Sequence, residues 1–482
     1  MNNYAFATIK ELRAALEAKK ITSQELLDYY IERFKTYDPH VLSALEIFDK
    51  QSVLDASAKQ GMLAGIPGLI KDTICQKDRI ASCSSKILEN FVSPYDATAV
   101  ERLKQQGALL LGRANCDEFA MGSSGETSAF QKTTNPWDKS RVPGGSSSGS
   151  AACVAAGLVP WSLGTETGGS VRQPAALCGI VGLKPTYGLV SRYGLIAYGS
   201  SLDQIGIFTR TAYDNALVLS AMAGHDTHDS TSLPESPKDY TKDLTGKIKP
   251  GLTIGVIDNA LHAEGIDPEI VHCIEDAIKV YEKLGATIKR ITVPTLDYAA
   301  AVYFIISRAE AASNLARFDG VRYGYRDKSA KTLAQMYTQT RQHGFGDEVK
   351  ARILIGNYVL SSGHADAYYN NAEKVRRLMR KEFADQFKNV DLMLAPVHPA
   401  PAFKFGAFDN DKLQMDLQDY FTCAMNLVGI PALAFPCGMS SSKLPIGMQL
   451  IGPELSEGLL FQTAHAYEQL TPWHTQHPES FK

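Results

Sequence analysis

The sequence predicts one large α/β domain, and three observations lead to this fold class. Short apolar segments typical of buried strands alternate with helical patterns from about residue 65 onward. These strand signals recur up to residue 451 without a flexible linker between them. The length of 482 residues is also sufficient for a sizeable core. We therefore expect a single domain over residues 1–482 rather than several small ones.

Residues 1–60 are predicted to form N-terminal helices, because two capping boxes occur there. Thr8 precedes Glu11 by three positions, and Thr22 precedes Glu25 in the same way. In such a pair each side chain accepts a hydrogen bond from the backbone N–H of the other residue. The segment is charged rather than apolar, so it lacks the pattern of a secretion signal.

The central segment, residues 61–210, begins the alternation of strands and helices. We expect a strand over residues 66–70, a helix over 97–106 that Gly107 ends, and a strand over 108–111. The remainder, residues 211–482, contains a polar segment over 226–247 that is predicted to be a surface loop. The further elements expected there are strands at 252–257, 287–293, 392–396 and 445–451, and helices at 268–284, 300–318, 347–385 and 457–469.

The composition excludes several classes of function. The chain has 49 Lys and Arg against 52 Asp and Glu, a net charge of −3, without the basic excess of a direct nucleic-acid binder. Its 8 cysteines form no CxxC pair, which fits neither a disulfide scaffold nor a structural zinc site. The sequence of residues 225–229, HDTHD, resembles a metal site in composition but is predicted to be a turn. We expect a cytoplasmic protein without a metal site or a membrane span.

Glycine and serine are concentrated in one region that is a candidate for chemistry. Eleven of the 38 glycines lie between residues 144 and 194, and two turns there read GGSSSGS (144–150) and GTETGGS (164–170). A phosphate-binding loop is not supported, because no Lys-Ser or Lys-Thr follows the glycines. A flexible linker predicts polar neighbours, whereas residues 151–159 and 175–183 are apolar. A serine nucleophile beside backbone amides that bind an oxyanion is the interpretation we favour.

A serine nucleophile needs a base, and none of the 11 histidines lies between residues 41 and 224. A distant histidine could fold into the site, but Lys71 is the local candidate, because it ends the apolar strand predicted at 66–70. A free lysine has a pKa of about 10.4, and lowering it by about three units takes roughly 4 kcal/mol, which burial can supply. A base formed by a buried lysine is thus physically feasible.

Together, Lys71 and the two turns resemble the motifs of the amidase signature family. The resemblance implies a central mixed sheet flanked by helices. It also implies a triad in which Ser170 is the nucleophile, Ser146 relays protons and Lys71 is the base. The peptide bond between Gly145 and Ser146 is then cis, and the oxyanion is expected to bind to the backbone amides of Thr167, Gly168 and Gly169.

Within this family the sequence is most similar to the A subunits of tRNA-dependent amidotransferases, through residues 115–124, 310–324 and 426–431. That similarity implies a glutaminase whose substrate is held by Tyr303, Arg352 and Asp419. Arginine suits the α-carboxylate of glutamine and aspartate suits its α-ammonium group. The alternative for these three residues is ordinary ion pairing on helix surfaces.

The same similarity implies two partners, the B and C subunits of a heterotrimer. Ammonia would pass to the B subunit, which uses ATP and Mg²⁺ to amidate Glu-tRNA(Gln) or Asp-tRNA(Asn), while the small C subunit holds the complex together. This chain would bind no cofactor and would contact tRNA mainly through its partner.

Two alternative functions remain: a stand-alone amidase for another carboxamide with the same triad, and a non-catalytic scaffold protein.

Three positions depart from the usual pattern of these families. Ser148 stands where a second glycine is usual, and Glu166 stands where aspartate is usual. Phe304 follows Tyr303 where a second tyrosine is common, so the residue that corresponds to the substrate-binding tyrosine could be at position 303 or 304.

Overall fold

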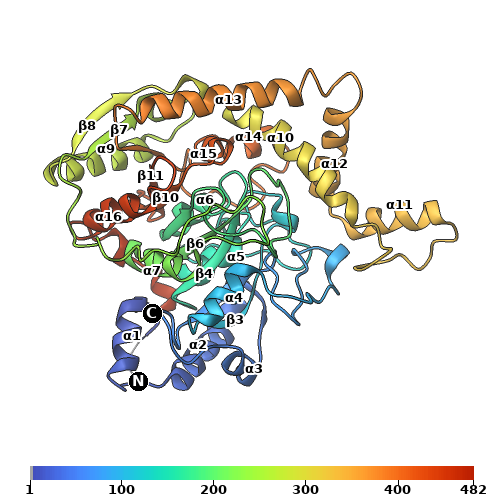
Figure 1. Cartoon of the computed structure of the whole chain (residues 1–482), viewed down its shortest axis with the longest axis horizontal. Helices are drawn as coiled ribbons and strands as arrows, with labels where there is room; N and C mark the ends of the chain where they lie inside the picture. Colours follow the sequence, from blue (N-terminus) through green and yellow to red (C-terminus); the bar gives the residue numbers. More distant parts are fainter. Residues whose placement is uncertain (1–3) are drawn as a thin grey trace.

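Eleven strands join one mixed sheet in the computed structural model, which describes residues 4–482 (Figure 1). The predicted α/β fold with a central mixed sheet is therefore confirmed. The strands in chain order are β1 (Ala44–Ile47), β2 (Pro67–Lys71), β3 (Leu109–Ala114), β4 (Trp161–Glu166), β5 (Val181–Lys184), β6 (Gln204–Thr209), β7 (Thr253–Ile257), β8 (Thr287–Ile291), β9 (Leu392–Pro396), β10 (Ala432–Met439) and β11 (Pro445–Ile451).

The order of the strands across the sheet is β1-β3-β2-β4-β6-β5-β10-β11-β9-β7-β8. Strand β2 is parallel to both β3 and β4, and β7 is parallel to both β8 and β9. The strands between these two groups pair antiparallel. Two parallel units at the flanks, each with a helical crossover, thus enclose an antiparallel centre.

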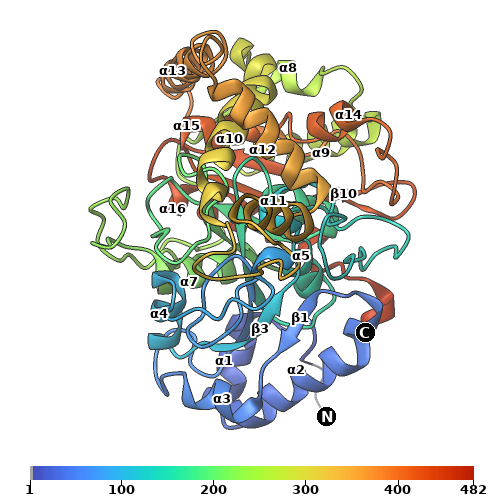
Figure 2. The ribbon, with the colours of Figure 1, turned by 90° about the vertical axis from the view of Figure 1, so that its right-hand side faces the viewer.

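Helices surround this sheet within the described residues (Figures 1 and 2). They are α1 (Ile9–Glu17), α2 (Ser23–Tyr37), α3 (Lys50–Asp55), α4 (Thr98–Gln105), α5 (Ser148–Ala155), α6 (Arg172–Cys178), α7 (Ala212–Met222), α8 (Asp258–Leu261), α9 (Pro268–Lys283), α10 (Ala299–Asn314), α11 (Leu333–Gly344), α12 (Asp347–Leu360), α13 (Tyr369–Gln386), α14 (Lys412–Leu417), α15 (Cys423–Val428) and α16 (Glu457–Glu468). Helices α10, α12 and α13 pack together at the end of the molecule opposite α1 to α3.

Helices α5 and α6 are buried along their whole length, and each directly follows one of the glycine-rich turns. Small side chains let α5 approach its neighbours closely: a Cβ on Gly149 would lie 2.1 Å from the carbonyl oxygen of Ser43. Because α5 and α6 are fixed by the core, the turns that lead into them are fixed as well.

All the predicted strands are present, but one predicted helix is divided in two and five further strands were not expected. The helix expected over 347–385 is two helices, α12 and α13, separated by a break that contains Gly363 with φ +84°. Glycine adopts this left-handed conformation without strain, so the chain can turn there. Strands β1, β4, β5, β6 and β10 were not expected. Strand β10 contains Pro436 beside a shift in the pairing with β11, where the regular hydrogen-bond pattern is already interrupted.

Both capping boxes are confirmed, at Thr8 with Glu11 and at Thr22 with Glu25. The polar segment 226–247 contains no helix or strand, as predicted. No helix within residues 4–482 is long and apolar enough to cross a membrane.

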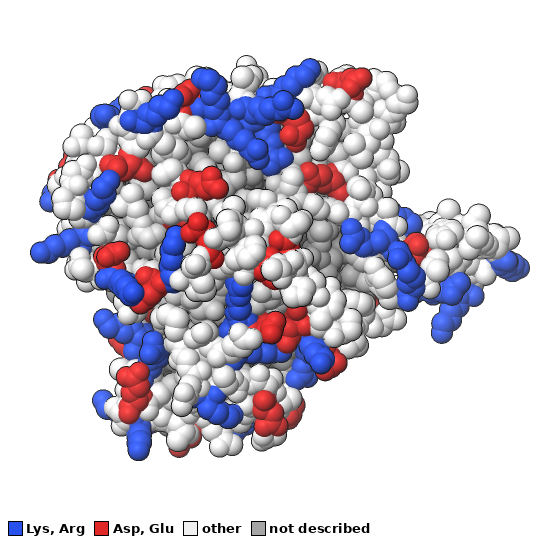
Figure 3. Space-filling view, in the orientation of Figure 1, with Lys and Arg blue, Asp and Glu red and all other residues white. Residues whose placement is uncertain are grey.

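Charges of both signs are mixed over most of the face in Figure 3, except along α13. The exposed basic residues of α13 are Lys374, Arg377, Arg380 and Lys381. Figure 3 shows basic side chains gathered at the upper edge of the view, where α13 lies in Figure 1. The protein therefore has a local basic surface on α13, although its net charge is close to zero.

Candidate active site

Lys71 lies at the carboxyl end of β2, fully buried, in contact with both glycine-rich turns. Its Nζ donates hydrogen bonds to Ser146 Oγ at 2.7 Å, to Ser147 Oγ at 3.0 Å and to Thr165 Oγ1 at 2.8 Å. Strand β2 is parallel to β4, which carries Thr165, so both strands end at the same edge of the sheet. The predicted base and relay are thus in direct contact.

The peptide bond between Gly145 and Ser146 is cis, as expected. Two hydrogen bonds hold this segment: Gly145 N–H donates to Gln173 Oε1 at 3.0 Å, and Asp117 N–H donates to the Ser146 carbonyl at 3.0 Å. A Cβ on residue 145 would lie 2.1 Å from Asp117 Oδ2, so only glycine fits there. The position of Ser146 is therefore determined by its surroundings.

Burial lowers the pKa of the Lys71 ammonium to about 8, although the nearby thiol of Cys116 and the carboxyl groups of Asp117 and Asp203 favour the charged form. A lysine with this pKa is partly neutral near pH 7 to 8, where a free lysine is almost entirely protonated. The structure thus supplies the condition that a lysine base requires.

We expect kcat/KM for hydrolysis of the substrate to rise with pH and to level off above about pH 8. The neutral form of Lys71 accepts the proton, and its fraction grows as pH passes through the pKa of about 8. The measurement is a set of initial rates from pH 6 to 9.5. A profile that is flat across pH 8, or that falls there, would contradict the role of Lys71 as base.

Ser170 lies in the turn between β4 and α6, which Glu166 organises. The Glu166 carboxylate accepts the backbone N–H groups of Val171 at 3.1 Å and Arg172 at 3.0 Å. Gly169 in this turn has φ +151°, and a Cβ there would lie 2.2 Å from Thr422 Oγ1. These contacts explain why glycine precedes the predicted nucleophile.

The same turn presents backbone donors that have no acceptor. The N–H groups of the predicted donors Thr167, Gly168 and Gly169, and that of Ser170, donate to no other group among residues 4–482. The hydroxyl of Thr167 donates to Asp203 Oδ1 at 2.7 Å, which fixes the start of the turn. Unpaired and fixed N–H groups are what stabilisation of an oxyanion requires.

The two predicted catalytic serines lie on neighbouring segments. Ser147 N–H donates to the Ser170 carbonyl at 3.3 Å, which joins the two turns. In the described part of the chain, the Ser146 and Ser170 hydroxyls do not form a hydrogen bond with each other. Catalytic hydrogen bonds often form only when substrate is bound, so this geometry is compatible with the predicted relay.

A buried ion pair between Arg172 and Glu166 stabilises the turn that carries Ser170. Arg172 Nε donates to Glu166 Oε1 at 2.9 Å, and both side chains are fully buried. The guanidinium also donates to Gln449 Oε1 at 2.6 Å and to Asn426 Oδ1 at 2.9 Å. Arg172 therefore connects the turn to β11 and α15 and anchors it.

The three predicted substrate-binding residues come from separate parts of the chain: Tyr303 and Asp419 lie at this turn, and Arg352 is close enough to both to influence their pKa values. Tyr303 of α10 faces Gly168, where a Cβ would lie 2.5 Å from the tyrosine Cζ. Asp419, which follows α14, lies next to Gly169, where a Cβ would be 3.4 Å from Oδ1. Arg352 of α12 donates from Nη1 to the Tyr198 hydroxyl at 2.8 Å and from Nε to Glu348 at 2.7 Å.

Asp419 is a buried carboxyl group without a cationic partner in hydrogen-bond contact among the described residues. Ser123 Oγ donates to its Oδ2 at 2.8 Å, and burial raises its pKa to about 7. A cation placed beside it would favour the ionised form. The site is thus complementary to an ammonium group at this position.

A pocket of about 280 Å³ opens beside these residues. Arg352, Ser123, Arg308, Glu348 and Asp416 are among the side chains that line it. Its size and its charged lining suit a small polar molecule rather than a large apolar one.

The structure also shows the surroundings of the three residues that depart from the usual family pattern. Tyr303, not Phe304, faces the nucleophile turn. Glu166 binds the turn through both oxygens. Ser148 is fully buried at the start of α5, and its hydroxyl has no hydrogen-bond partner in residues 4–482.

Several residues that hold the site together were missed in the sequence. Ser147 and Thr165 bind Lys71, Ser123 binds Asp419, and Tyr198 binds Arg352. Ser147 lies inside a glycine-rich turn and could have been noticed there. Tyr198 gives no local signal, because its role depends on a contact across 154 positions.

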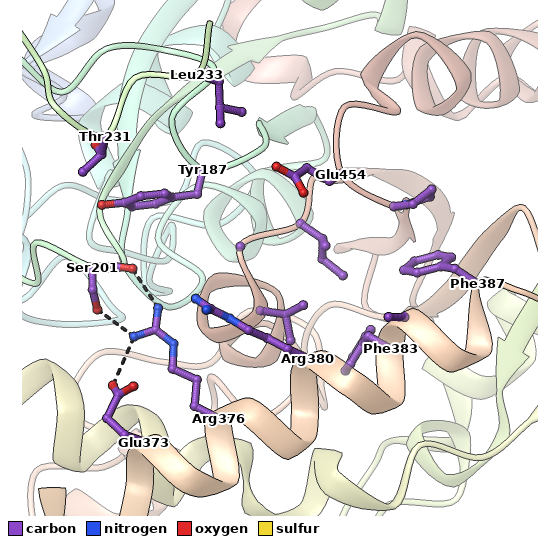
Figure 4. A pocket seen from close by; sticks show the side chains of 15 residues that line it. Tyr187, Ser201, Thr231, Leu233, Glu373, Arg376, Arg380, Phe383, Phe387 and Glu454 are labelled. Carbon is purple, nitrogen blue, oxygen red and sulfur yellow. Dashed lines mark hydrogen bonds and ion pairs between the residues drawn. The ribbon is translucent and has the colours of Figure 1, made fainter. Parts of the chain in front are cut away.

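A second groove, of about 700 Å³, lies along α13 and contains none of the predicted site residues (Figure 4). Arg376 points from α13 toward Ser201 and donates to its hydroxyl at 2.8 Å and its carbonyl at 2.9 Å. Ser201 belongs to the loop that carries Tyr198. Arg376 therefore stabilises the loop whose Tyr198 accepts a hydrogen bond from Arg352.

The HDTHD segment forms a turn, in which His228 Nδ1 lies 3.0 Å from Asp226 Oδ1. Within residues 4–482 no three His, Cys, Asp or Glu side chains are grouped so that they could hold a metal ion.

Comparison with known proteins places this geometry in a family. The family model described as Amidase matches residues 25–461. The A subunit of glutamyl-tRNA(Gln) amidotransferase from Coxiella burnetii is 50% identical, over 98% of this chain and 99% of that protein. The crystal structure of the corresponding protein from Thermotoga maritima is 40% identical with a TM-score of 0.83, covering 98% of this chain and 96% of that one.

A peptide amidase from Stenotrophomonas maltophilia is 30% identical with a TM-score of 0.79, and the match covers 97% of each chain. Similarity over nearly the full length thus accompanies the buried lysine, the two serine-containing turns and the cis peptide bond. The chain belongs to the amidase family, in the branch of the glutamyl-tRNA(Gln) amidotransferase A subunits.

Proposed function

We propose that this chain hydrolyses glutamine and supplies the ammonia to a tRNA-dependent amidotransferase. The observation that carries the proposal is the placement of Asp419 beside the Ser170 turn, with Arg352 close enough to lower the pKa of the Asp419 carboxyl. Their opposite charges match the α-carboxylate and α-ammonium groups of a free amino acid. The similarity to amidotransferase A subunits supports the same substrate.

In the proposed reaction Ser170 Oγ attacks the side-chain carboxamide carbon, and its proton passes through Ser146 to the neutral amine of Lys71. The N–H groups of residues 168–170 stabilise the oxyanion, a contribution of about 3 to 4 kcal/mol per donor in a site of this kind. The proton then returns to the leaving nitrogen and ammonia departs. Water hydrolyses the γ-glutamyl ester, glutamate is released, and the hydroxyl of Ser170 is restored.

The B and C subunits belong to the same proposal. Ammonia passes to the B subunit, which uses ATP and Mg²⁺ and holds the tRNA, while the C subunit holds the complex together, and this chain itself binds no cofactor. The acceptor is Glu-tRNA(Gln), as the names of the relatives suggest, or Asp-tRNA(Asn). We place the reaction in the cytoplasm, because all 8 cysteines are free thiols and a reducing compartment keeps them so.

Isotope transfer tests the proposal. The chain in complex with its partner subunits is given ATP, Glu-tRNA(Gln) and glutamine labelled with ¹⁵N in the side-chain amide. We expect the label in the amide of the Gln-tRNA(Gln) formed, and an equal amount of glutamate. Glutamine that is not hydrolysed by the complex would contradict the proposal.

The similarity to a peptide amidase supports a second candidate, an amidase for another carboxamide with the same triad. Replacement of Arg352 by alanine separates the two. A glutamine enzyme should lose mainly affinity, because Arg352 binds the α-carboxylate. An amidase for uncharged substrates should be little affected by this change.

A further inference from the structure

Arg308 is a buried cation whose hydrogen-bonding capacity is largely unused. It lies on α10, five positions after Tyr303, and its side chain is 8% exposed. Its Nη2 donates to Asp416 Oδ2 at 2.9 Å. Its Nε and Nη1 are buried and have no hydrogen-bond partner within residues 4–482. A guanidinium has five N–H donors, so most of its capacity remains free.

Such a state is unusual for a buried charge. Buried polar groups in proteins are almost always hydrogen-bonded, and charged donors that lack an acceptor are the most costly. The Arg308 guanidinium also lies against the ring of Phe304, with Cζ 4.1 Å from the ring centroid, which fixes its plane. The group is therefore held in place while its donors remain free for an acceptor.

The surroundings of Arg308 indicate where that acceptor comes from. Arg308 lines the same pocket as Arg352 and as Ser123, the hydrogen-bond donor to Asp419. Arg352 already donates from Nε to Glu348 and from Nη1 to Tyr198, so only part of its donor set can turn to a ligand. An anionic ligand group bound by Arg352 is thus close to a second guanidinium with free donors.

The charges in the pocket support the same conclusion. Arg352 is paired with Glu348, and Arg308 is paired with Asp416. Asp419 has no such partner among the described residues and would bind the ammonium group of the substrate. The α-carboxylate bound by Arg352 can accept further hydrogen bonds, and the free N–H donors of Arg308 can supply them.

We infer that Arg308 binds the α-carboxylate of glutamine together with Arg352, and that it sets the preference for substrates that carry this group. This inference rests on the proposed glutaminase function. It predicts that a substrate with a neutral amide in place of the α-carboxylate gains nothing from Arg308.

The test uses the full complex and two substrates, glutamine and glutamine α-amide, with the variant Arg308→Met. For glutamine we expect KM to rise by about ten- to a hundred-fold with kcat nearly unchanged, the usual effect of losing a charged hydrogen bond. For the α-amide we expect KM to stay within about twofold of the wild-type value.

Two further variants separate direct binding from a structural role. Arg290→Met removes an arginine that pairs with Glu275 outside the pocket, and it should leave the KM for both substrates unchanged. Arg308→Lys keeps the charge but loses the planar donors, so it should recover part of the affinity. Thermal unfolding of each variant shows whether it is folded.

The inference is overturned if Arg308→Met leaves the KM for glutamine unchanged or raises both KM values equally. It is also overturned if Arg290→Met reproduces the effect of Arg308→Met, because the loss of affinity would then not be specific to the pocket arginine. Failure of the proposed function looks different: the wild-type complex itself would not hydrolyse glutamine.

Discussion

Replacement of Ser170 by alanine should abolish glutamine hydrolysis while amidation of the tRNA from added ammonium chloride continues. The variant removes the only atom that forms the covalent bond, so we expect the rate to fall by at least about 10⁴-fold. The ammonia-dependent reaction requires only the partner that holds the tRNA. Both rates are measured on the same preparation, one from glutamate release and the other from Gln-tRNA formation.

Ser148→Ala is the matched control for this experiment. Ser148 is also buried in the glycine-rich region, but its hydroxyl has no hydrogen-bond partner within residues 4–482. Its removal should leave glutamine hydrolysis near the wild-type rate, since no bond is lost. Glutaminase activity that survives in Ser170→Ala would mean that another residue is the nucleophile.

The local motifs predict a serine nucleophile in a glycine-rich turn with Lys71 as its base, whereas the roles of Ser146 and Ser170 come from the family resemblance. Lys71, Ser146 and Ser170 lie in or beside short segments whose glycines and apolar residues can be recognised from the sequence alone. Parallel pairing of β2 with β4 brings the ends of these strands together, but β4 was not among the predicted strands. For these residues, local sequence and global fold lead to the same arrangement.

The supporting contacts could not be predicted in this way. Tyr198 meets Arg352 across 154 positions, and Ser123 meets Asp419 across 296. Such contacts depend on how α12 and the segment after α14 pack against the core, and hydrophobic periodicity does not specify that packing. The break between α12 and α13 was missed for a related reason, because a helical pattern on both sides obscured a short turn at Gly363.

The largest loss of stability is expected from Arg172→Met. The Glu166 carboxylate would be left without its cation inside a fully buried site, and removal of one partner of such a pair costs about 3 to 5 kcal/mol. The bonds from Arg172 to Gln449 and Asn426 would be lost as well. The free energy of unfolding is measured by denaturant titration of the purified variant and the wild type.

A control and a double variant show whether the buried charge is the cause. Arg290 pairs with Glu275 at 2.7 Å on the surface, where its side chain is 43% exposed, so Arg290→Met should cost at most about 1 kcal/mol. Arg172→Met combined with Glu166→Gln should be less destabilised than Arg172→Met alone, because no unpaired charge remains. If Arg172→Met costs no more than Arg290→Met, the ion pair does not support the nucleophile turn. If the double variant regains stability but not activity, Glu166 is needed to shape the turn that presents Ser170.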